Sequence, residues 1–202
     1  MSNPMSAWQR LLAGNELFFL PVRGRQQTLH HGAPVAAVFR CADTDVASEM
    51  VFGQSWGSLL DVSTWGHVVD TGVLASLEHA VETLEVPLIV VLGHHECSAM
   101  RAAMRAWQHA ELPDGASRMV VEQALSSIVR RGSAADSVDE ISSAHVVSVG
   151  MSLLERSPLI ARRVDAGKCG IVCATTGHDG RVRPYATVGA LGEAGDSLLE
   201  CV

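Results

Sequence analysis

Three uninterrupted apolar runs constrain the fold of this chain most strongly. They are PVAAVF at 34–39, LIVVLG at 88–93 and CGIVCATT at 169–176. Each run has the length of a strand and lacks polar alternation, so each is expected to be buried on both faces. Strands of this kind are typical of a parallel sheet that is covered by helices on both sides.

The segments between these runs show helical periodicity, as in 73–84, where apolar residues recur along one helix face. Further helices are predicted at 4–13, with Gly14 as the stop, and at 97–109, 118–131 and 137–156. A weaker strand is predicted at 59–62, and Pro184 marks 182–188 as an edge strand. The pattern therefore predicts an α/β fold: a central, mostly parallel sheet with flanking helices and an antiparallel edge strand.

Composition bounds the architecture and excludes several partners. With 202 residues, 48% of them hydrophobic, the chain supplies one core, so 1–202 is expected to form a single domain. The net charge of −7 argues against a nucleic-acid partner. No apolar stretch reaches the roughly 20 residues of a membrane span, and the N-terminal residues lack the pattern of a signal peptide. Five cysteines, an odd number, favour a reducing, cytoplasmic location.

Two of the predicted strands run into residues that can bind a metal. The first leads to Cys41, and the second is followed by His94 and Cys97 at His-x-x-Cys spacing. Ligands gather beyond the carboxyl ends of parallel strands, and two cysteines with one histidine suit tetrahedral zinc. From these residues alone, Cys41 as a structural thiol and His94 as a hydrogen-bonded strand-end histidine stay open as alternatives.

The motifs resemble those of the β-class carbonic anhydrases, especially the actinobacterial branch. That family has Cys-x-Asp-x-Arg after one strand and His-x-x-Cys after another; here CADTD supplies Cys41 and Asp43, and HHEC supplies His94 and Cys97. The similarity extends to AWQRLLAGNELF, to the stretch from STWGHVVD to GHHEC, and to SPLIARRVDAGKCGIVCATTGHDGRV. It therefore covers nearly the whole chain.

The resemblance implies a fold, a cofactor and a reaction. It implies one Zn²⁺ per chain on Cys41, His94 and Cys97, and reversible hydration of CO₂ to bicarbonate by zinc-bound hydroxide. It makes Asp43 the catalytic carboxylate, which accepts a hydrogen bond from zinc-bound water. It also implies a homodimer or a dimer of dimers, in which residues 1–33, an N-terminal helix and arm, pack on the partner.

The chain departs from the family pattern at Asp45, which stands where the family has the Arg that pairs with the catalytic Asp. The replacement changes the local charge by two units and opposes both hydroxide and bicarbonate. It also leaves Asp43 without its usual partner, so Asp43 becomes a possible fourth zinc ligand. The plainer interpretation of Asp45 is a helix N-cap.

Other departures lie nearby. A second family Arg is replaced by Ser63, an Ala by Trp65, a Gly after His-x-x-Cys by Ser98, and a substrate-binding Gln by Gly32. The residues expected to line the substrate pocket are Asp45, Ser63, Trp65, Gly66 and Ser98. Trp65 either plugs this pocket or packs in the core.

Two kinds of function remain open on these observations. The first is carbonic anhydrase activity, weak or impaired, or shifted to a related substrate such as COS or CS₂. The second is a non-catalytic, zinc-stabilised protein with a binding or regulatory role; zinc ligands alone do not separate the two, because zinc also stabilises folds.

The remaining candidate residues say less about function. Cys169 and Cys173 are predicted core residues, and Cys201 lies in the tail. His30 and His31 are expected to be solvated, and His95 and Glu96 match variable positions.

Overall fold

A computed structural model describes residues 3–19, 29–132 and 135–191 of the chain. The strands are β1 (Ala36–Cys41), β2 (Leu59–Thr64), β3 (Leu88–His94), β4 (Gly170–Thr176) and β5 (Val182–Val188). The helices are α1 (Pro4–Glu16), α2 (Ser48–Val51), α3 (Thr71–Glu82), α4 (Ser98–His109), α5 (Ser117–Arg131), α6 (Val138–Arg156) and α7 (Pro158–Asp165), with 3-10 segments η1 (Leu17–Phe19) and η2 (Trp65–His67).

The five strands form one sheet in the order β2-β1-β3-β4-β5. The pairs β1–β2, β1–β3 and β3–β4 are parallel, and β5 is antiparallel to β4. This confirms the predicted mostly parallel sheet with an antiparallel edge strand. The chain leaves β1 toward β2 on one side and returns as β3 on the other, so the strand order reverses between β1 and β3, where α/β proteins commonly bind ligands.

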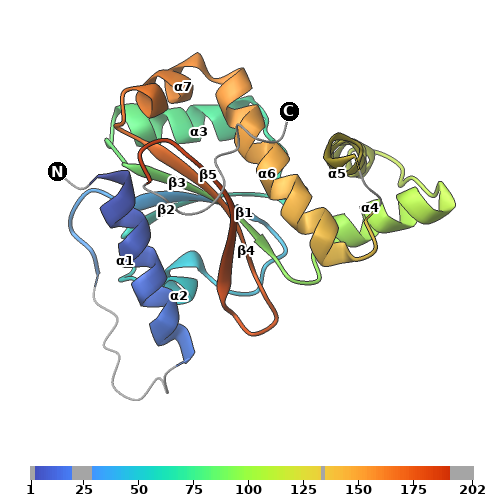
Figure 1. Cartoon of the computed structure of the whole chain (residues 1–202), viewed down its shortest axis with the longest axis horizontal. Coiled ribbons are helices and arrows are strands. Elements are labelled where there is room, and N and C mark those ends of the chain that lie inside the picture. Colours follow the sequence, from blue (N-terminus) through green and yellow to red (C-terminus); the bar gives the residue numbers. More distant parts are fainter. Residues whose placement is uncertain (1–2, 20–28, 133–134, 192–202) are drawn as a thin grey trace.

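Helices cover both faces of the sheet, which explains the uninterrupted apolar strands (Figure 1). On one face, Ala37, Phe39, Ile89 and Val91 pack with buried residues of α3, α6 and α7. On the other face, the alternate strand residues pack with α1 and α2. Because neither face meets water there, residues 36–39 of β1 and 88–92 of β3 are all apolar.

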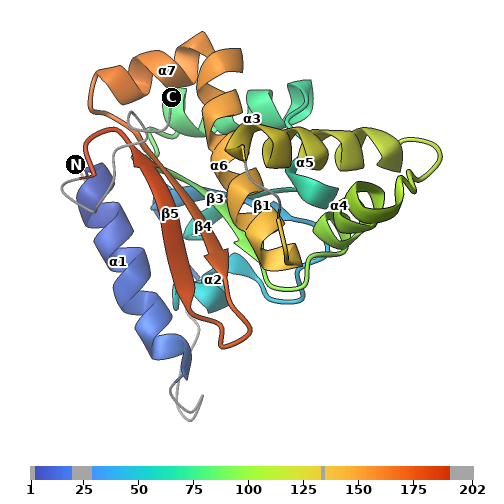
Figure 2. The ribbon, with the colours of Figure 1, turned by 45° about the vertical axis from the view of Figure 1, so that its right-hand side comes forward.

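A third apolar cluster lies beside the sheet, where α4, α5 and the start of α6 pack together. Figures 1 and 2 both show α4 and α5 standing away from the sheet. The cluster includes Cys41 and Cys97 among its buried residues. It therefore joins the helical pair to the ends of β1 and β3.

Three local predictions were wrong or incomplete. Gly14 does not end the first helix, which continues to Glu16; a Cβ on Gly14 would lie 1.8 Å from the carbonyl oxygen of Phe52, so glycine serves close packing there. Helix α7 was missed, although Ser157 caps it and Pro158 begins it. The N-cap of α2 is Ala47, so Asp45 is no helix cap.

Helix α1 packs on the sheet of its own chain in this structure, with Trp8 and Leu11 in the core. The packing of residues 1–33 on a partner stays a prediction, and 20–28 lies outside the described residues. Among the described helices, none has the length and apolar character needed to cross a bilayer.

Candidate metal centre

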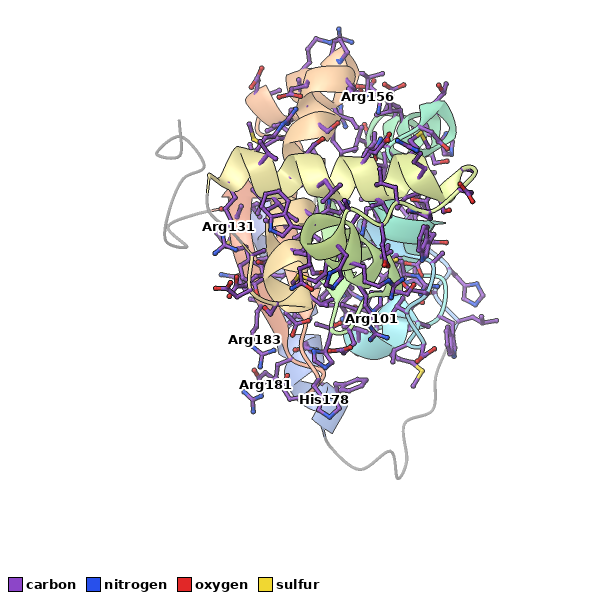
Figure 3. All side chains as sticks on the ribbon, turned by 90° about the vertical axis from the view of Figure 1, so that its right-hand side faces the viewer. Arg101, Arg131, Arg156, His178, Arg181 and Arg183 are labelled. Carbon is purple, nitrogen blue, oxygen red and sulfur yellow. The ribbon has the colours of Figure 1, made fainter. Side chains whose placement is uncertain are left out.

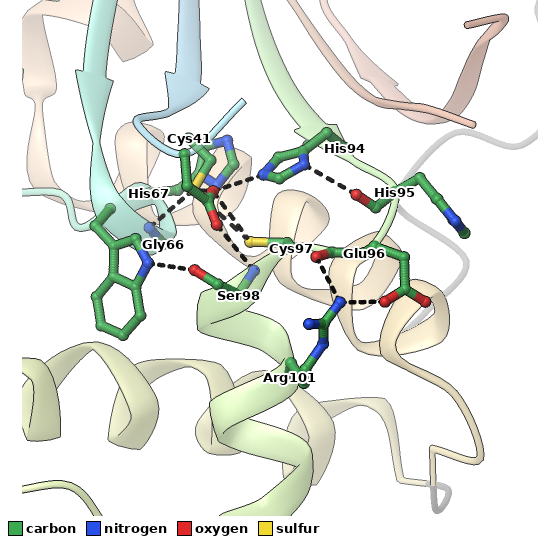
Figure 4. A network of polar contacts seen from close by, with 12 residues as sticks. Cys41, Gly66, His67, His94, His95, Glu96, Cys97, Ser98 and Arg101 are labelled. Carbon is green, nitrogen blue, oxygen red and sulfur yellow. Dashed lines mark hydrogen bonds and ion pairs between the residues drawn. The ribbon is translucent and has the colours of Figure 1, made fainter. Parts of the chain in front are cut away.

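The ends of β1 and β3 bring the predicted ligands together (Figure 4). Cys41 is the last residue of β1 and His94 the last of β3, while Cys97 directly precedes α4. The sulfur atoms of Cys41 and Cys97 lie 3.7 Å apart. Both cysteines are buried, and His94 is partly buried, so the cluster lies at the edge of the core.

Asp43 reaches into the same cluster from the turn that follows β1. Its Oδ1 atom lies 2.7 Å from His94 Nε2 and 2.7 Å from Cys41 Sγ. Its Oδ2 atom accepts a hydrogen bond of 2.9 Å from the backbone N–H of Ser98. The Ser98 amide therefore fixes one carboxylate oxygen and turns the other toward the ligand atoms.

Burial and the hydrogen bonds among the four side chains set their protonation states. The hydrogen bond with Cys97 and burial raise the pKa of the Cys41 thiol far above its usual range, whereas the hydrogen bond from Cys41 lowers the pKa of Cys97. Burial raises the pKa of Asp43, but hydrogen bonds from Cys41 and Ser98 outweigh it, and the net shift is downward. Burial lowers the pKa of His94, but its contacts with Cys41 and Asp43 raise it overall. Two thiols this close do not both ionise unless a cation balances them.

The donor set fits zinc. One ligand atom from each of Cys41, Asp43, His94 and Cys97 lies within 4.8 Å of the others. The 3.7 Å between the sulfur atoms matches the edge of about 3.8 Å of a tetrahedron with Zn–S bonds of about 2.3 Å. Thiolate and imidazole are typical zinc ligands, and a carboxylate is an accepted fourth.

The residues predicted for the substrate pocket have different surroundings. Asp45 and Ser63 are exposed, and Gly66 is buried, with its N–H 3.2 Å from Cys41 Sγ. Trp65 is half-buried against the α4–α5 cluster and donates its indole N–H to Ser98 Oγ at 2.8 Å. Trp65 thus contacts the side chain of Ser98, whose backbone amide holds Asp43 in the metal-ligand cluster.

A cavity of about 460 Å³ opens beside His94. Its wall includes His95, Asp139, Thr176 and His178. It is not lined by any of the five residues predicted for the substrate pocket, so that assignment stays a prediction. His95 Nδ1 lies 2.8 Å from a carboxylate oxygen of Asp139, which gives this variable position a defined partner.

Two arginines at this end of the molecule, Arg101 and Arg183, already form ion pairs with carboxylates other than Asp43. Figure 3 shows Arg101, His178 and Arg183 toward the same end. Arg101 is paired with Glu96, and Arg183 with Asp179. Within the described part of the chain, no arginine lies at ion-pair distance from Asp43, which pairs with His94 instead.

The other candidate residues behave largely as predicted. Cys169 and Cys173 are buried in the apolar core, while His31 is exposed and half-buried His30 contacts the carbonyl of Ala33. Cys201 lies outside the described residues.

Sequence reasoning missed two buried histidines near the metal-ligand cluster, His67 and His145. Their sequence signal was weak, because isolated histidines in apolar segments have no fixed spacing to the ligands.

Comparison with known proteins agrees with this geometry. A family profile described as "Carbonic anhydrase" matches residues 36–182. The chain belongs to the carbonic anhydrase family. Its fold is that of the β class: it superimposes on a Coccomyxa β-carbonic anhydrase solved with acetazolamide, with a TM-score of 0.67 and 20% identity over 93% of this chain and 86% of that one.

Relatives from mycobacteria cover almost the full length. "Carbonic anhydrase 2" of Mycobacterium tuberculosis strain H37Rv is 40% identical over 205 residues, covering 95% of this chain and 98% of the relative. A carbonic anhydrase of Mycolicibacterium smegmatis is 41% identical over 203 residues, with the same coverage. The resemblance to the actinobacterial branch of the β class is thus confirmed.

Proposed function

We propose that this chain is a zinc-dependent protein of the β-carbonic anhydrase type whose hydration of CO₂ is weak at neutral pH. Cys41, His94 and Cys97 would hold the metal, and Asp43 would compete with water for the fourth position. Bound zinc would supply Lewis-acid activation of water. The mycobacterial relatives named as carbonic anhydrases support the reaction class.

The position of Asp43 carries the proposal. Its carboxylate lies among the ligand atoms, within 2.7 Å of both His94 Nε2 and Cys41 Sγ. No described arginine pairs with it, and the Ser98 amide holds its second oxygen. An oxygen engaged in this way is not free to accept a hydrogen bond from a reacting water.

The surroundings add an electrostatic argument. Asp45 presents an exposed carboxylate at the position where the family pattern has a cation. Negative charge near the site opposes the formation of hydroxide and the binding of bicarbonate, while a cation would favour both. The engagement of Asp43 and the negative charge of Asp45 are therefore both expected to slow hydration.

A second candidate is a non-catalytic protein stabilised by zinc, with a binding or regulatory role. The specific observation in its favour is that four side chains supply four donor atoms, because structural zinc sites are closed in this way. A shift of substrate to COS or CS₂ is supported by Trp65, a half-buried indole next to Ser98 that would favour a less polar substrate.

Stopped-flow CO₂ hydration by the zinc-loaded protein tests the proposal, with COS hydrolysis measured in parallel. We expect about one zinc per chain and a kcat/KM well below the roughly 10⁷ M⁻¹s⁻¹ of an efficient enzyme. A value at or above that level would overturn the impaired-site proposal. Full zinc content with no hydration above buffer would select the non-catalytic candidate, and faster turnover of COS than of CO₂ would select the altered substrate.

Assembly and location belong to the same proposal. We infer a homodimer or a dimer of dimers; a solved structural neighbour from Sordaria macrospora, 17% identical with a TM-score of 0.65, is described as tetrameric. Cytoplasmic location is supported by the described cysteines, Cys41, Cys97, Cys169 and Cys173, all of which are free thiols. Light scattering of the purified protein would measure the oligomer, and a mass equal to one chain would exclude both assemblies.

A further inference from the structure

One sulfur atom of the cluster has a partner outside the ligand set. The backbone N–H of Gly66 in η2 donates to Cys41 Sγ at 3.2 Å (Figure 4). Hydrogen bonds to a thiolate ligand withdraw electron density from the sulfur and so tune the metal that it holds. The orientation of a single peptide therefore bears on the chemistry of the site.

This peptide points at the sulfur because η2 has an unusual backbone. Gly66 has φ 67° and His67 has φ 55°, so two successive residues are left-handed. The second is a bulky non-glycine residue, for which this region is strained. At Gly66 no side chain fits, since a Cβ would lie 2.3 Å from Val120 Cγ1. A strained turn of this kind persists only when neighbouring groups hold it.

His145 of α6 provides such a contact. Its Nε2 atom lies 2.9 Å from the carbonyl oxygen of Gly66, and its Nδ1 atom lies 2.9 Å from Ser127 Oγ on α5. A carbonyl oxygen only accepts, so Nε2 carries the proton and Nδ1 accepts from the Ser127 hydroxyl. Burial lowers the pKa of His145, in keeping with this neutral form.

A second contact holds the other half of the turn. His67 Nε2 lies 3.0 Å from the carbonyl oxygen of Leu92 on β3, so it too donates from Nε2. The turn is therefore tied to β3 through His67 and to α5 and α6 through His145. Ser127, His145 and His67 are buried polar residues that the ligand set does not use.

We propose that His145 is a positioning residue for the metal centre. With Ser127 behind it, His145 holds the Gly66 carbonyl, which fixes the left-handed backbone of Gly66 and so keeps the N–H of the preceding peptide aimed at Cys41 Sγ. The inference rests on the proposed zinc site, and goes beyond it by assigning a role to residues that contact no ligand side chain. Its consequence is a weaker thiolate donor at Cys41 and a more Lewis-acidic metal.

Cobalt-substituted protein provides a readout that a merely structural role would not move. Co²⁺ bound by thiolates gives sulfur-to-cobalt charge-transfer absorption, whose energy reports electron density on sulfur. His145→Leu removes the donor to Gly66, so we expect this band to move to longer wavelength. His145→Gln places an amide N–H near Nε2, and we expect it to restore most of the wild-type position.

Adjacent serines on α5 supply a matched control. Ser126 Oγ donates to the carbonyl oxygen of Glu122, one turn back in the helix. Ser127 Oγ lies 3.1 Å from the corresponding carbonyl oxygen of Gln123, but it also lies 2.9 Å from His145 Nδ1, which takes its one hydroxyl proton. Ser127→Ala should shift the band in the same direction as His145→Leu and by less, whereas Ser126→Ala should leave it unchanged.

The outcomes separate this inference from the proposed function. A wild-type protein without a thiolate–cobalt band would overturn the metal site itself. A normal wild-type band with an unshifted position in His145→Leu would overturn only the positioning role. If His145→Leu fails to fold, Ser127→Ala decides: an unshifted band there, or one equally shifted in Ser126→Ala, contradicts the proposal.

Discussion

Two pairs of buried cysteines in this protein have different surroundings. Cys41 and Cys97 lie beyond the carboxyl ends of β1 and β3, with their sulfur atoms 3.7 Å apart and with Asp43 and His94 in contact. Cys169 and Cys173 lie before and within β4, in an apolar core cluster. All four are nearly inaccessible to solvent. Burial therefore does not distinguish a ligand from a core thiol, whereas strand-end position and polar neighbours do.

The ionisation of the two pairs differs for the same reason. Burial raises the pKa of Cys169 and of Cys173 to about 12, so both remain neutral thiols. In the other pair, the hydrogen bond between the sulfurs raises the pKa of Cys41 and lowers that of Cys97. Only the Cys41–Cys97 pair is arranged to become anionic when a cation binds.

The largest expected effect is on metal content. Cys97→Ala should lose the zinc, because two protein ligands and a carboxylate remain where four donors were. Cys173→Ala, the matched change in the core pair, should keep about one zinc per chain. Metal analysis after dialysis measures both, and stoichiometric zinc in Cys97→Ala would contradict the ligand set.

Acidification should weaken zinc binding in a way specific to the first pair. The raised pKa of Cys41 means that its proton must leave when zinc binds. Because the folded metal-free site holds that proton at neutral pH, zinc affinity should rise with pH and fall as pH drops, by about tenfold per pH unit for each displaced proton. Competition with a chromophoric chelator between pH 6 and pH 8 measures this; an affinity independent of pH would exclude the protonated thiol.

Restoring the cation should improve hydration only in part. Asp45→Arg would offer Asp43 a bidentate partner and draw it from the ligand atoms, which Lys could not copy. The triple change Gly32→Gln, Asp45→Arg, Trp65→Ala should exceed the single change by at least about tenfold, or roughly 1.4 kcal/mol of barrier. Stopped-flow hydration on zinc-matched samples measures the rates.

A charge-reversal control separates the local effect from net charge. Glu111→Arg makes the same change in the exposed segment after α4, at the end of that helix far from Cys97. It should leave the rate unchanged. If it raises hydration as much as Asp45→Arg does, the local argument at Asp43 is wrong.

The smallest expected effect lies in the core pair. A Cβ added to Gly150 of α6 would lie 2.4 Å from Cys173 Sγ, so Gly150→Ala should lower the free energy of unfolding by about 1–3 kcal/mol. Cys173→Ala in the same chain should recover part of that loss, because it removes the crowding sulfur. Urea unfolding of both single variants and the double variant measures the coupling energy. If the two changes in unfolding free energy add strictly, the steric conflict between Gly150→Ala and Cys173 is excluded.

Much of this fold was predictable because its signals are local. The apolar runs that become β1, β3 and β4 are continuous since helices cover both faces. The candidate ligands stand at the ends of β1 and β3 or directly after β3 in the sequence. Gly14 was misjudged because its role depends on Phe52, 38 residues away, which no local pattern reports. The same limit applies to His145, whose contact with Gly66 spans α6 and η2.

The site was predictable in its ligands and less so in its surroundings. Cys41, His94 and Cys97 were placed by strand ends and spacing. Asp43 was placed by the resemblance to the family motif, and its predicted role as a fourth ligand came from the loss of its Arg partner at position 45. The contact of Ser98 N–H with Asp43 and that of Gly66 N–H with Cys41 involve backbone groups. Backbone groups carry no sequence signature, so these contacts required the structure.

The position of Asp43 in the zinc-loaded protein tests the account most directly. A crystal structure at neutral pH should show one zinc on Cys41, His94 and Cys97, with an Asp43 oxygen at the roughly 2.0–2.2 Å of a zinc–carboxylate bond. Zinc on the same three residues, with water in the fourth position and Asp43 beyond about 3 Å, would contradict the claim that Asp43 closes the site.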